Sequence, residues 1–423
     1  MRLMKNRRAI ILLFVANFIS AISQGISMIS IPWYFTTIDK MEVFGWIYVA
    51  TNVIALFWVP LSGTLTDKYD RKYLLMALMS VLGVILFSVG IYGVLHEGLP
   101  WGMVALVFTL TFLNYTLHYP TLYAFVQEMT EPEYYGKITS IIEVQGQLAT
   151  ISAGAGAALL LEGTIGSNIS IFGVPLENIW ATPAWGIHEI FLLDGCTYVL
   201  GILFLSFISY SSFFERKISK SGVLTQLKVG IDYLRENPYV LIFGLASYCV
   251  FVAVIIEGFY LMAPYVQRHL LEGAEVYAIG EMTYALGAIF SGLTIRWIFR
   301  KVKLTDSVAI LSVLGSIVFL VFFATKSVAI FYVFGILLGL VNAGVRIQRV
   351  TYLFSKIPNE VYGRANSVFN LGNIAFRVIF LSIFALSFFQ EGNNITYAFL
   401  ILSIFILMGV VVLIVFRKKI LLD

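Results

Sequence analysis

The stretch Gly63-Thr64-Leu65-Thr66-Asp67-Lys68-Tyr69-Asp70-Arg71-Lys72 joins two long apolar segments and decides the fold. It holds a glycine, an aspartate four residues later, and basic residues at positions 68, 71 and 72. Gly63 permits two helices to approach closely, and Asp67 can lie against the positive N-terminal end of a neighbouring helix. The basic residues hold the turn on one side of a membrane and can pair with acids such as Glu128. The stretch predicts a charged turn between two membrane-spanning helices.

The composition places most of the surface in lipid. Of 423 residues, 59% are hydrophobic and 12% are charged, with a mean hydropathy of +0.89. A soluble globular chain carries about 25% charged residues. The net charge of +4 would elsewhere suggest nucleic acid, but the basic residues form short clusters between apolar runs. We therefore expect a lipid bilayer, and no nucleic acid, as the surrounding partner.

Apolar runs of about 20 residues are long enough to span a bilayer as helices. The first run, from Ala9 past Ile31, exceeds the ~7–15 apolar residues of a cleaved signal, so it is expected to remain as a helix. The sequence predicts an all-α membrane protein with twelve transmembrane helices in two six-helix halves. The expected spans are 9–35, 43–65, 73–95, 102–127, 136–160, 189–211, 239–265, 275–298, 306–325, 328–353, 362–388 and 395–416.

The lysines and arginines predict the orientation. Of the 28, 22 fall in the termini and the connections on the same side as them, and three, Lys40, Arg268 and Lys326, fall on the other side. The remaining three, Arg346, Arg349 and Arg377, lie within spans. Because basic residues are retained on the cytoplasmic side during insertion, we expect a multi-pass protein of the inner (plasma) membrane with both termini cytoplasmic.

The expected halves are residues 1–212 and 239–423, joined by a cytoplasmic linker at 213–238. Apolar residues recur in the linker at helical spacing, which predicts a short amphipathic helix. A pattern of Pro, then Tyr-Gly, a basic residue and Ser occurs at 132–140 and again at 358–367. These positions correspond in the two halves, which indicates an internal repeat.

The 63–72 stretch resembles the loop signature of the major facilitator superfamily, and the layout of nearly the whole chain is similar to that family. The resemblance implies the major facilitator fold, with alternating access to a central cavity. It also implies that this loop latches the inner gate, with Asp67 facing the start of the eleventh helix near 362–364. The segments 118–122 and 227–238 and the entry to the fifth span resemble the macrolide-efflux branch, to which lysophospholipid transporters and some siderophore exporters are similar.

Polar residues at membrane depth are the candidate site residues, because a charge there costs at least ~2.5 kcal/mol. In the family, the first, fourth, seventh and tenth helices line the cavity. Arg349 is close enough to the inner face to snorkel, whereas Arg377 is too deep and should have a partner. The proton-coupling candidates are Glu257, Glu281 and Glu143. The cavity and substrate candidates are Gln24, Asn114, His118, Arg346 and Arg377.

The expected function is secondary active export of amphiphilic organic compounds of the drug or macrolide type, by an antiporter. No nucleotide-binding loop is present, so the expected driving force is a gradient of protons or another coupling ion. No metal-ligand spacing is present, so neither a metal nor another cofactor is expected. A lysophospholipid or siderophore/metal-chelate transporter remains an alternative, as does a membrane sensor that does not transport. We expect a monomer that is not an enzyme and acts on a small-molecule substrate.

Overall fold

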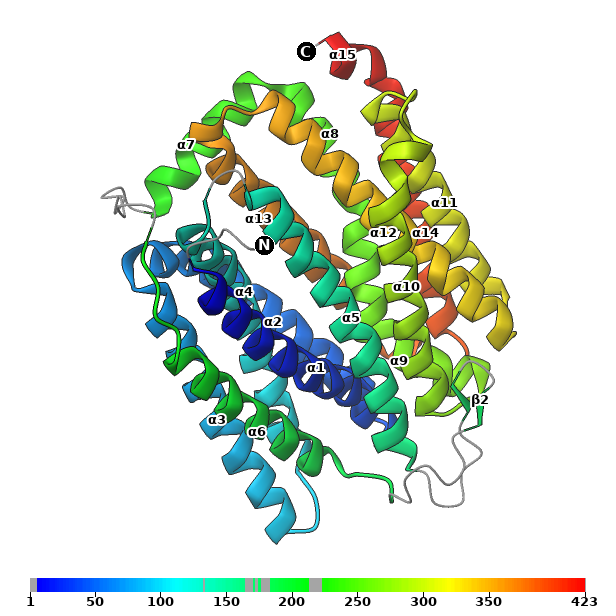
Figure 1. The fold of residues 1–423 in the computed structure, drawn as a ribbon. Helices are drawn as coiled ribbons and strands as arrows, with labels where there is room; N and C mark the ends of the chain where they lie inside the picture. Colours follow the sequence, from blue (N-terminus) through cyan, green and yellow to red (C-terminus); the bar gives the residue numbers. More distant parts are fainter. Residues whose placement is uncertain are drawn as a thin grey trace. The chain divides into compact units, whose positions relative to one another are not determined.

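The computed structural model is almost entirely helical (Figure 1). It describes residues 6–131, 134–163, 170–171, 174–175, 183–212 and 223–422. The strands are β1 (Ser170–Ile171) and β2 (Val174–Pro175), which pair antiparallel with Ser170 opposite Pro175. The protein is therefore an all-α membrane protein, as predicted.

The spans of the first half closely match the predicted ranges. The sixth span ends earlier than predicted, at Ser206 rather than residue 211. The helices are α1 (Arg7–Thr37), α2 (Met41–Lys68), α3 (Arg71–Leu95), α4 (Trp101–Met129), α5 (Tyr135–Glu162) and α6 (Ile187–Ser206).

The second half begins with the short helix α7 (Val223–Glu236), which lies in the predicted linker. The seventh span, Pro238–Leu270, consists of α8 (Pro238–Ile256), η2 (Glu257–Leu261), α9 (Met262–Pro264) and η3 (Tyr265–Leu270), of which η2 and η3 are π-helical. The remaining elements are α10 (Ala274–Ile298), α11 (Leu304–Ala324), α12 (Val328–Lys356), α13 (Asn359–Phe384), η4 (Ser387–Gln390), α14 (Ile395–Val415) and α15 (Arg417–Leu422).

Among the described residues, eleven helical stretches are long and apolar enough to cross a membrane. The twelfth long helix, α4, has 29 residues, but Asn114, Thr116 and His118 lower its hydropathy. These polar side chains fall among the apolar residues of the span. With α4, the chain has the predicted twelve spans.

The chain divides into two compact units. The first consists of Met1–Ile38 and Phe57–Lys220, and the second of Asp39–Leu56 and Ser221–Asp423. The division after Lys220 lies within the predicted linker. Residues 39–56, which the sequence pattern assigned to the first half, cluster with the second unit. Tertiary packing of the first part of α2, which sequence pattern does not report, accounts for this difference.

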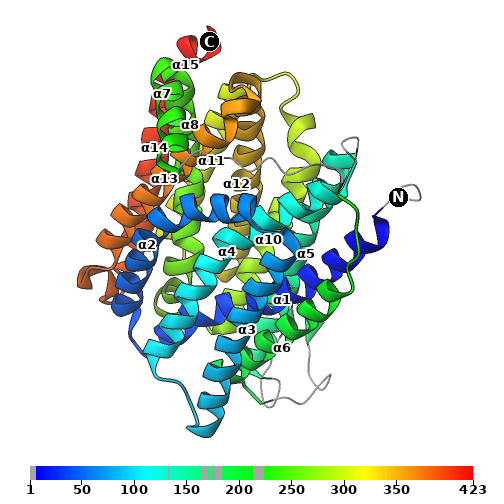
Figure 2. The same cartoon turned by 90° about the vertical axis from the view of Figure 1, so that its left-hand side faces the viewer.

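Within the first unit, α3 packs along α6, and α1 packs along both α5 and α6 (Figure 2). Small residues allow the approach of α1 and α5. A Cβ added at Gly25 would lie 2.6 Å from Ala153 Cβ, and one added at Gly156 would lie 2.8 Å from Ile26. Without an apolar driving force between helices in lipid, such close packing is what holds them together.

Within the second unit, α10 and α12 are in backbone contact. A Cβ added at Gly287 would collide with the Ile336 carbonyl oxygen, and one added at Gly339 would collide with the Tyr284 carbonyl oxygen. Two glycines, one on each helix, therefore set the separation of α10 and α12. The helix α7 packs against α13, where the missing side chain of Gly230 leaves room for the Arg364 carbonyl.

Candidate functional site

The turn between α2 and α3 is anchored to two other helices of the first unit. Asp70 caps α3 by accepting from the backbone amides of residues 72 and 73. Arg71 Nη1 lies 3.0 Å from Glu128 Oε2 at the end of α4, which confirms the predicted pairing of the turn with this acid. Lys72 Nζ donates to the Ser206 and Ile208 carbonyls at the end of α6, at 3.2 and 2.8 Å. A cation at the C-terminal end of a helix is favourable.

Two other residues of this motif do not contribute packing in the described structure. A Cβ added at Gly63 would meet no described atom within 4 Å, so the close helix approach predicted there is not found. Lys68 is exposed and lies over the Tyr69 ring at 5.5 Å. The side chain of Asp67 lies outside the described residues, so its latch role stays a prediction.

Three of the predicted site residues, Glu257, Glu281 and Arg346, converge in the second unit. Glu257 is the first residue of the π-helix η2 and is 4% exposed. Glu281 of α10 is the charged residue that interacts electrostatically with Glu257. Glu281 Oε1 lies 3.8 Å from the position that a Cβ on Gly258 would take. Because π-helical turns insert an extra residue and are frequent at functional sites, η2 singles out Glu257 as a candidate.

Tyr284 is the centre of this group of residues. Its hydroxyl accepts from Asn342 Nδ2 at 2.6 Å, and Arg346, Glu257 and Glu281 all act on it electrostatically. We call Glu257, Glu281, Tyr284, Asn342 and Arg346 the acid–arginine cluster. The approach of α10 to α12 brings Tyr284 to Asn342. Its amide, phenol and guanidinium groups can form hydrogen bonds, and a carboxyl group is the kind of side chain that can take up a proton.

Two other arginines of the second unit are more completely buried than Arg346 and interact with tyrosines. Arg349 lies 3.7 Å from the Tyr248 ring centroid, donates to the Ser247 carbonyl at 3.1 Å and is 4% exposed. It does not snorkel, contrary to the prediction, because the Tyr248 ring provides a cation–π contact inside the protein. Arg377 is 9% exposed and interacts electrostatically with Tyr48 of α2.

In the first unit the predicted site residues lie mainly on α1 and α4. His118 Nε2 and Asn17 Oδ1 are 3.1 Å apart and join these helices. Asn114, one turn before His118, is 8% exposed, and its Oδ1 has no hydrogen-bond partner among the described residues. Gln24 is half-buried on α1. The structure brings His118 to α1, and within the described part of the chain no hydrogen bond joins Gln24, Asn114 and His118 to one another.

Glu143 of α5 accepts a hydrogen bond from the Tyr123 hydroxyl of α4 at 2.8 Å. Nearby, Gln145 Nε2 donates to the Phe14 carbonyl at 2.7 Å and so joins α5 to α1. An apolar cavity of about 680 Å³ opens beside this bond. It is lined by Phe14, Val15, Phe18, Ser140, Ile141, Val144, Gln145 and Leu148.

One buried acid, Asp194 of α6, was not among the predicted residues, and it is 0% exposed. The Ser27 hydroxyl donates to its Oδ2 at 2.8 Å. The signal that could have found it is simple, because it is the only charged residue within the apolar run from 190 to 206.

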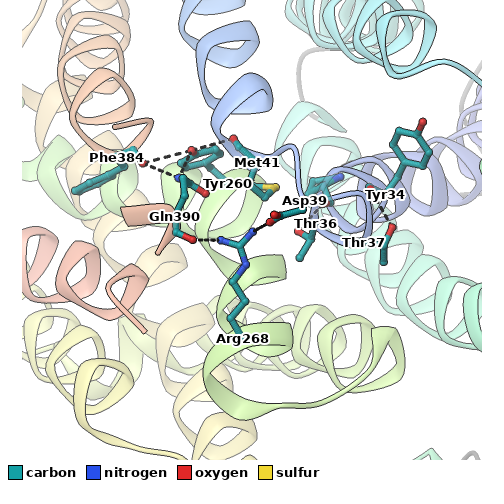
Figure 3. Close-up of polar contacts among 10 residues, drawn as sticks. Tyr34, Thr36, Thr37, Asp39, Met41, Tyr260, Arg268, Phe384 and Gln390 are labelled. Carbon is teal, nitrogen blue, oxygen red and sulfur yellow. Dashed lines mark hydrogen bonds and ion pairs between the residues drawn. The ribbon is translucent and has the colours of Figure 1, made fainter. Parts of the chain in front are cut away.

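A polar clasp holds the first part of α2 to the rest of the second unit (Figure 3). Arg268 Nη2 lies 2.7 Å from Asp39 Oδ1, and its Nη1 donates to the Gln390 carbonyl at 2.8 Å. The Tyr260 hydroxyl donates to the Met41 carbonyl at 3.1 Å and accepts from Gln390 Nε2 at 3.0 Å. We call Asp39, Met41, Tyr260, Arg268 and Gln390 the clasp.

We predict that Arg268→Ala loosens residues 39–45 more than Asp39→Ala does. The Asp39 side chain is 90% exposed, and an exposed ion pair contributes about 0–1 kcal/mol. Arg268 also donates a charge-assisted bond to Gln390, worth about 1.5–3 kcal/mol. Hydrogen exchange at residues 39–45 measures the difference. Arg235→Ala, which removes an exposed pair with Asp232, is the control, and equal effects of Arg268→Ala and Asp39→Ala would contradict the clasp.

The sequence model of the Major Facilitator Superfamily matches residues 13–373. The chain belongs to the major facilitator superfamily. It is therefore a transmembrane transporter, and the twelve spans are those of the major facilitator fold. A search of curated proteins finds no match.

Solved structures of several transporters are similar in fold. A mutant form of the nucleoside transporter NupG matches with a TM-score of 0.72 and 14% identity, over 96% of this chain and 99% of that one. A bacterial metal transporter matches with a TM-score of 0.64 and 14% identity, over 97% and 98%. A bacterial homologue of the human lysosomal transporter Spinster, inward-facing and unoccupied, matches with a TM-score of 0.65 and 12% identity, over 99% and 96%. At these identities the likeness extends to the fold alone.

Proposed function

We propose that the protein is a secondary active exporter of amphiphilic organic compounds, of the drug or macrolide type. The observation that carries this proposal is the apolar cavity between α1 and α5. Its volume of about 680 Å³ lies in the ~300–1,000 Å³ range of small-molecule sites. Apolar walls with a few polar groups, here Ser140 and Gln145, suit a substrate with a large apolar body and a small polar part.

The acid–arginine cluster supports coupling of export to a proton. Two carboxyl groups close together in buried surroundings do not readily ionise at the same time. Buried Glu257 and half-buried Glu281 interact electrostatically as such a pair, and a proton is the smallest ion that can neutralise one of them. Arg346 supplies a cation that can favour the ionised form when the proton leaves. The protein then works as a proton antiporter, with Glu143 as an alternative carrier.

The loop from Gly63 to Lys72 is proposed as the inner gate latch. Asp67→Asn is expected to remove most transport while leaving folding and substrate binding largely intact. An acid at a helix N-terminus contributes ~0.3–2 kcal/mol, which shifts a conformational equilibrium more than an affinity. Initial transport rates and substrate binding of the two proteins are the measurements. Wild-type rates in Asp67→Asn would refute the latch.

The two halves, 1–212 and 239–423, are proposed to rock about the linker at 213–238, in a monomer in the inner (plasma) membrane with both termini cytoplasmic. The cation asymmetry of the connections supports this orientation. A reporter fused after Asp423 should be cytoplasmic, and one inserted at Ser170 should lie outside. Both reporters on one side would reject the layout.

A direct screen tests the substrate class. Purified protein in liposomes with an imposed pH gradient is given a macrolide, a lysophospholipid, a ferric siderophore and a nucleoside in turn. Export of the macrolide, abolished by filling the cavity with Val144→Trp but not by Val199→Trp on the exposed face of α6, supports the proposal. Transport of only the lysophospholipid or the siderophore would favour those alternatives. No transport of any probe, with binding retained, would favour a sensor.

A further inference from the structure

Asp194 is the acid of the first unit that is most completely enclosed among the described residues. Its exposed fraction is 0%, and it lies seven residues after the start of α6. Its Oδ2 accepts the 2.8 Å hydrogen bond from Ser27 of α1. Its Oδ1 is buried and has no hydrogen-bond partner among the described residues. One oxygen of the carboxyl group is satisfied and the other is available.

The carboxyl group of Asp194 is enclosed and has no positively charged partner among the described residues. Its one hydrogen bond among the described residues comes from Ser27, and no basic side chain in the described part of the chain lies within hydrogen-bond distance of it. An isolated carboxylate in apolar surroundings is so unfavourable that such groups take up a proton instead. Asp194 is the only aspartate that is buried among those described.

We infer that Asp194 is a proton-binding site of the transporter, and that it holds a proton in this conformation. Loading forms an O–H bond at Oδ1 with a proton taken from water, and release returns that proton. Ser27 is the link to transport, because it lies on α1, which also lines the apolar cavity and carries Asn17. The inference rests on the proposed coupling to protons.

Among the described residues, the titratable group that interacts electrostatically with Asp194 is Tyr198. Tyr198 lies one turn after Asp194 on α6 and also interacts electrostatically with Tyr119 of α4. Tyr119 is in turn acted on by Tyr123 and Glu143. The Tyr123 hydroxyl donates to Glu143.

The other contacts of this region are uncharged. From α3, Phe87 lies 3.3 Å from the Cβ position of Gly195, and the Cβ of Tyr198 lies 3.3 Å from that of Gly83. From α1, the group that reaches Asp194 is the Ser27 hydroxyl. A proton that binds the Asp194 carboxylate neutralises it, so no further counter-ion is needed there.

Infrared spectroscopy of purified protein carrying carboxyl-¹³C aspartate tests occupancy without any transport. A neutral aspartic acid gives a C=O band that moves with the isotope label. The wild type should show this band at neutral pH, Asp194→Asn should lack it, and Glu257→Gln should keep it. Ser27→Ala should shift the band without removing it, because it removes only the hydrogen bond. Absence of the labelled band in the wild type, or its persistence in Asp194→Asn, would overturn the inference.

Transport in liposomes then tests the coupling. Asp194→Asn should keep substrate exchange, but the stimulation of its uphill export by the pH gradient should fall by about tenfold or more. The control variant Asn393→Asp, which changes an exposed residue of the second unit, should behave as wild type. Uphill export by Asp194→Asn with an unchanged pH profile would overturn the coupling role even if the band is lost. If the wild type transports nothing, the proposed function fails, yet the infrared result still decides whether Asp194 holds a proton. Should Asp194→Asn not fold, the band shift in Ser27→Ala remains the test of occupancy.

Discussion

Replacing Glu257 with glutamine is expected to end uphill export while substrate exchange across the membrane continues. Glutamine keeps the shape of the side chain and cannot take up or release a proton. Glu257 lies at the start of η2 beside Glu281, and both act on Tyr284. Accumulation against a gradient should fall to the background of empty liposomes, while exchange should stay within about threefold of wild type.

Glu272→Gln is the matched control, because Glu272 is an exposed acid in the connection after η3. Glu281→Gln should give an intermediate loss, since Glu257 would then lack its acidic neighbour. Uphill export that survives Glu257→Gln with unchanged pH dependence would remove Glu257 from the mechanism. The same result for Glu281→Gln and Glu143→Gln would leave Asp194 as the remaining carboxyl candidate.

Gly287→Ala is expected to destabilise the second unit severely. The added methyl group would collide with a backbone carbonyl of Ile336, and a backbone atom cannot turn aside as a side-chain tip can. Overpacking costs about 1–3 kcal/mol, occasionally more, and we expect the upper end of that range. The loss should appear as a lower midpoint of thermal unfolding in detergent.

Gly292→Ala on the same helix is the control, because a Cβ there meets no described atom within 4 Å. Removing an unneeded glycine from a helix stabilises it by about 0.5–1 kcal/mol. The two substitutions should therefore move the unfolding midpoint in opposite directions. Equal midpoints would show that α10 and α12 are not in backbone contact.

The spans could be predicted from sequence because a helix that crosses a bilayer needs about 20 consecutive, mainly apolar residues. The pairing of Arg71 with Glu128 was also predictable, since both residues lie at helix ends on the same side. The π-helical turns at Glu257 and Tyr265 could not be predicted, because no pattern in the apolar run differs from that of an α-helix.

The clasp was not predictable for a different reason. Tyr260 and Met41 are 219 residues apart in the sequence. Neither Tyr260 nor Gln390 belongs to a sequence motif that would mark it as functional. The prediction for Arg349 was wrong for the same reason. Its short distance from the helix end suggested that the side chain snorkels to the membrane surface, but it packs inside the protein against the Tyr248 ring of another helix. Asp194, in contrast, was visible as a lone acid in an apolar run and was overlooked.

The assignment of residues 39–56 to the second unit has a consequence for biosynthesis. The Met41 carbonyl leaves the ribosome 219 residues before its partner Tyr260, a delay of roughly 10–45 s at ~5–20 residues per second. During that time the first part of α2 has no native neighbours from its own unit. Until the seventh span arrives, the first part of α2 lacks its contact with Tyr260, so its native contacts are completed only after the second half of the chain has been made.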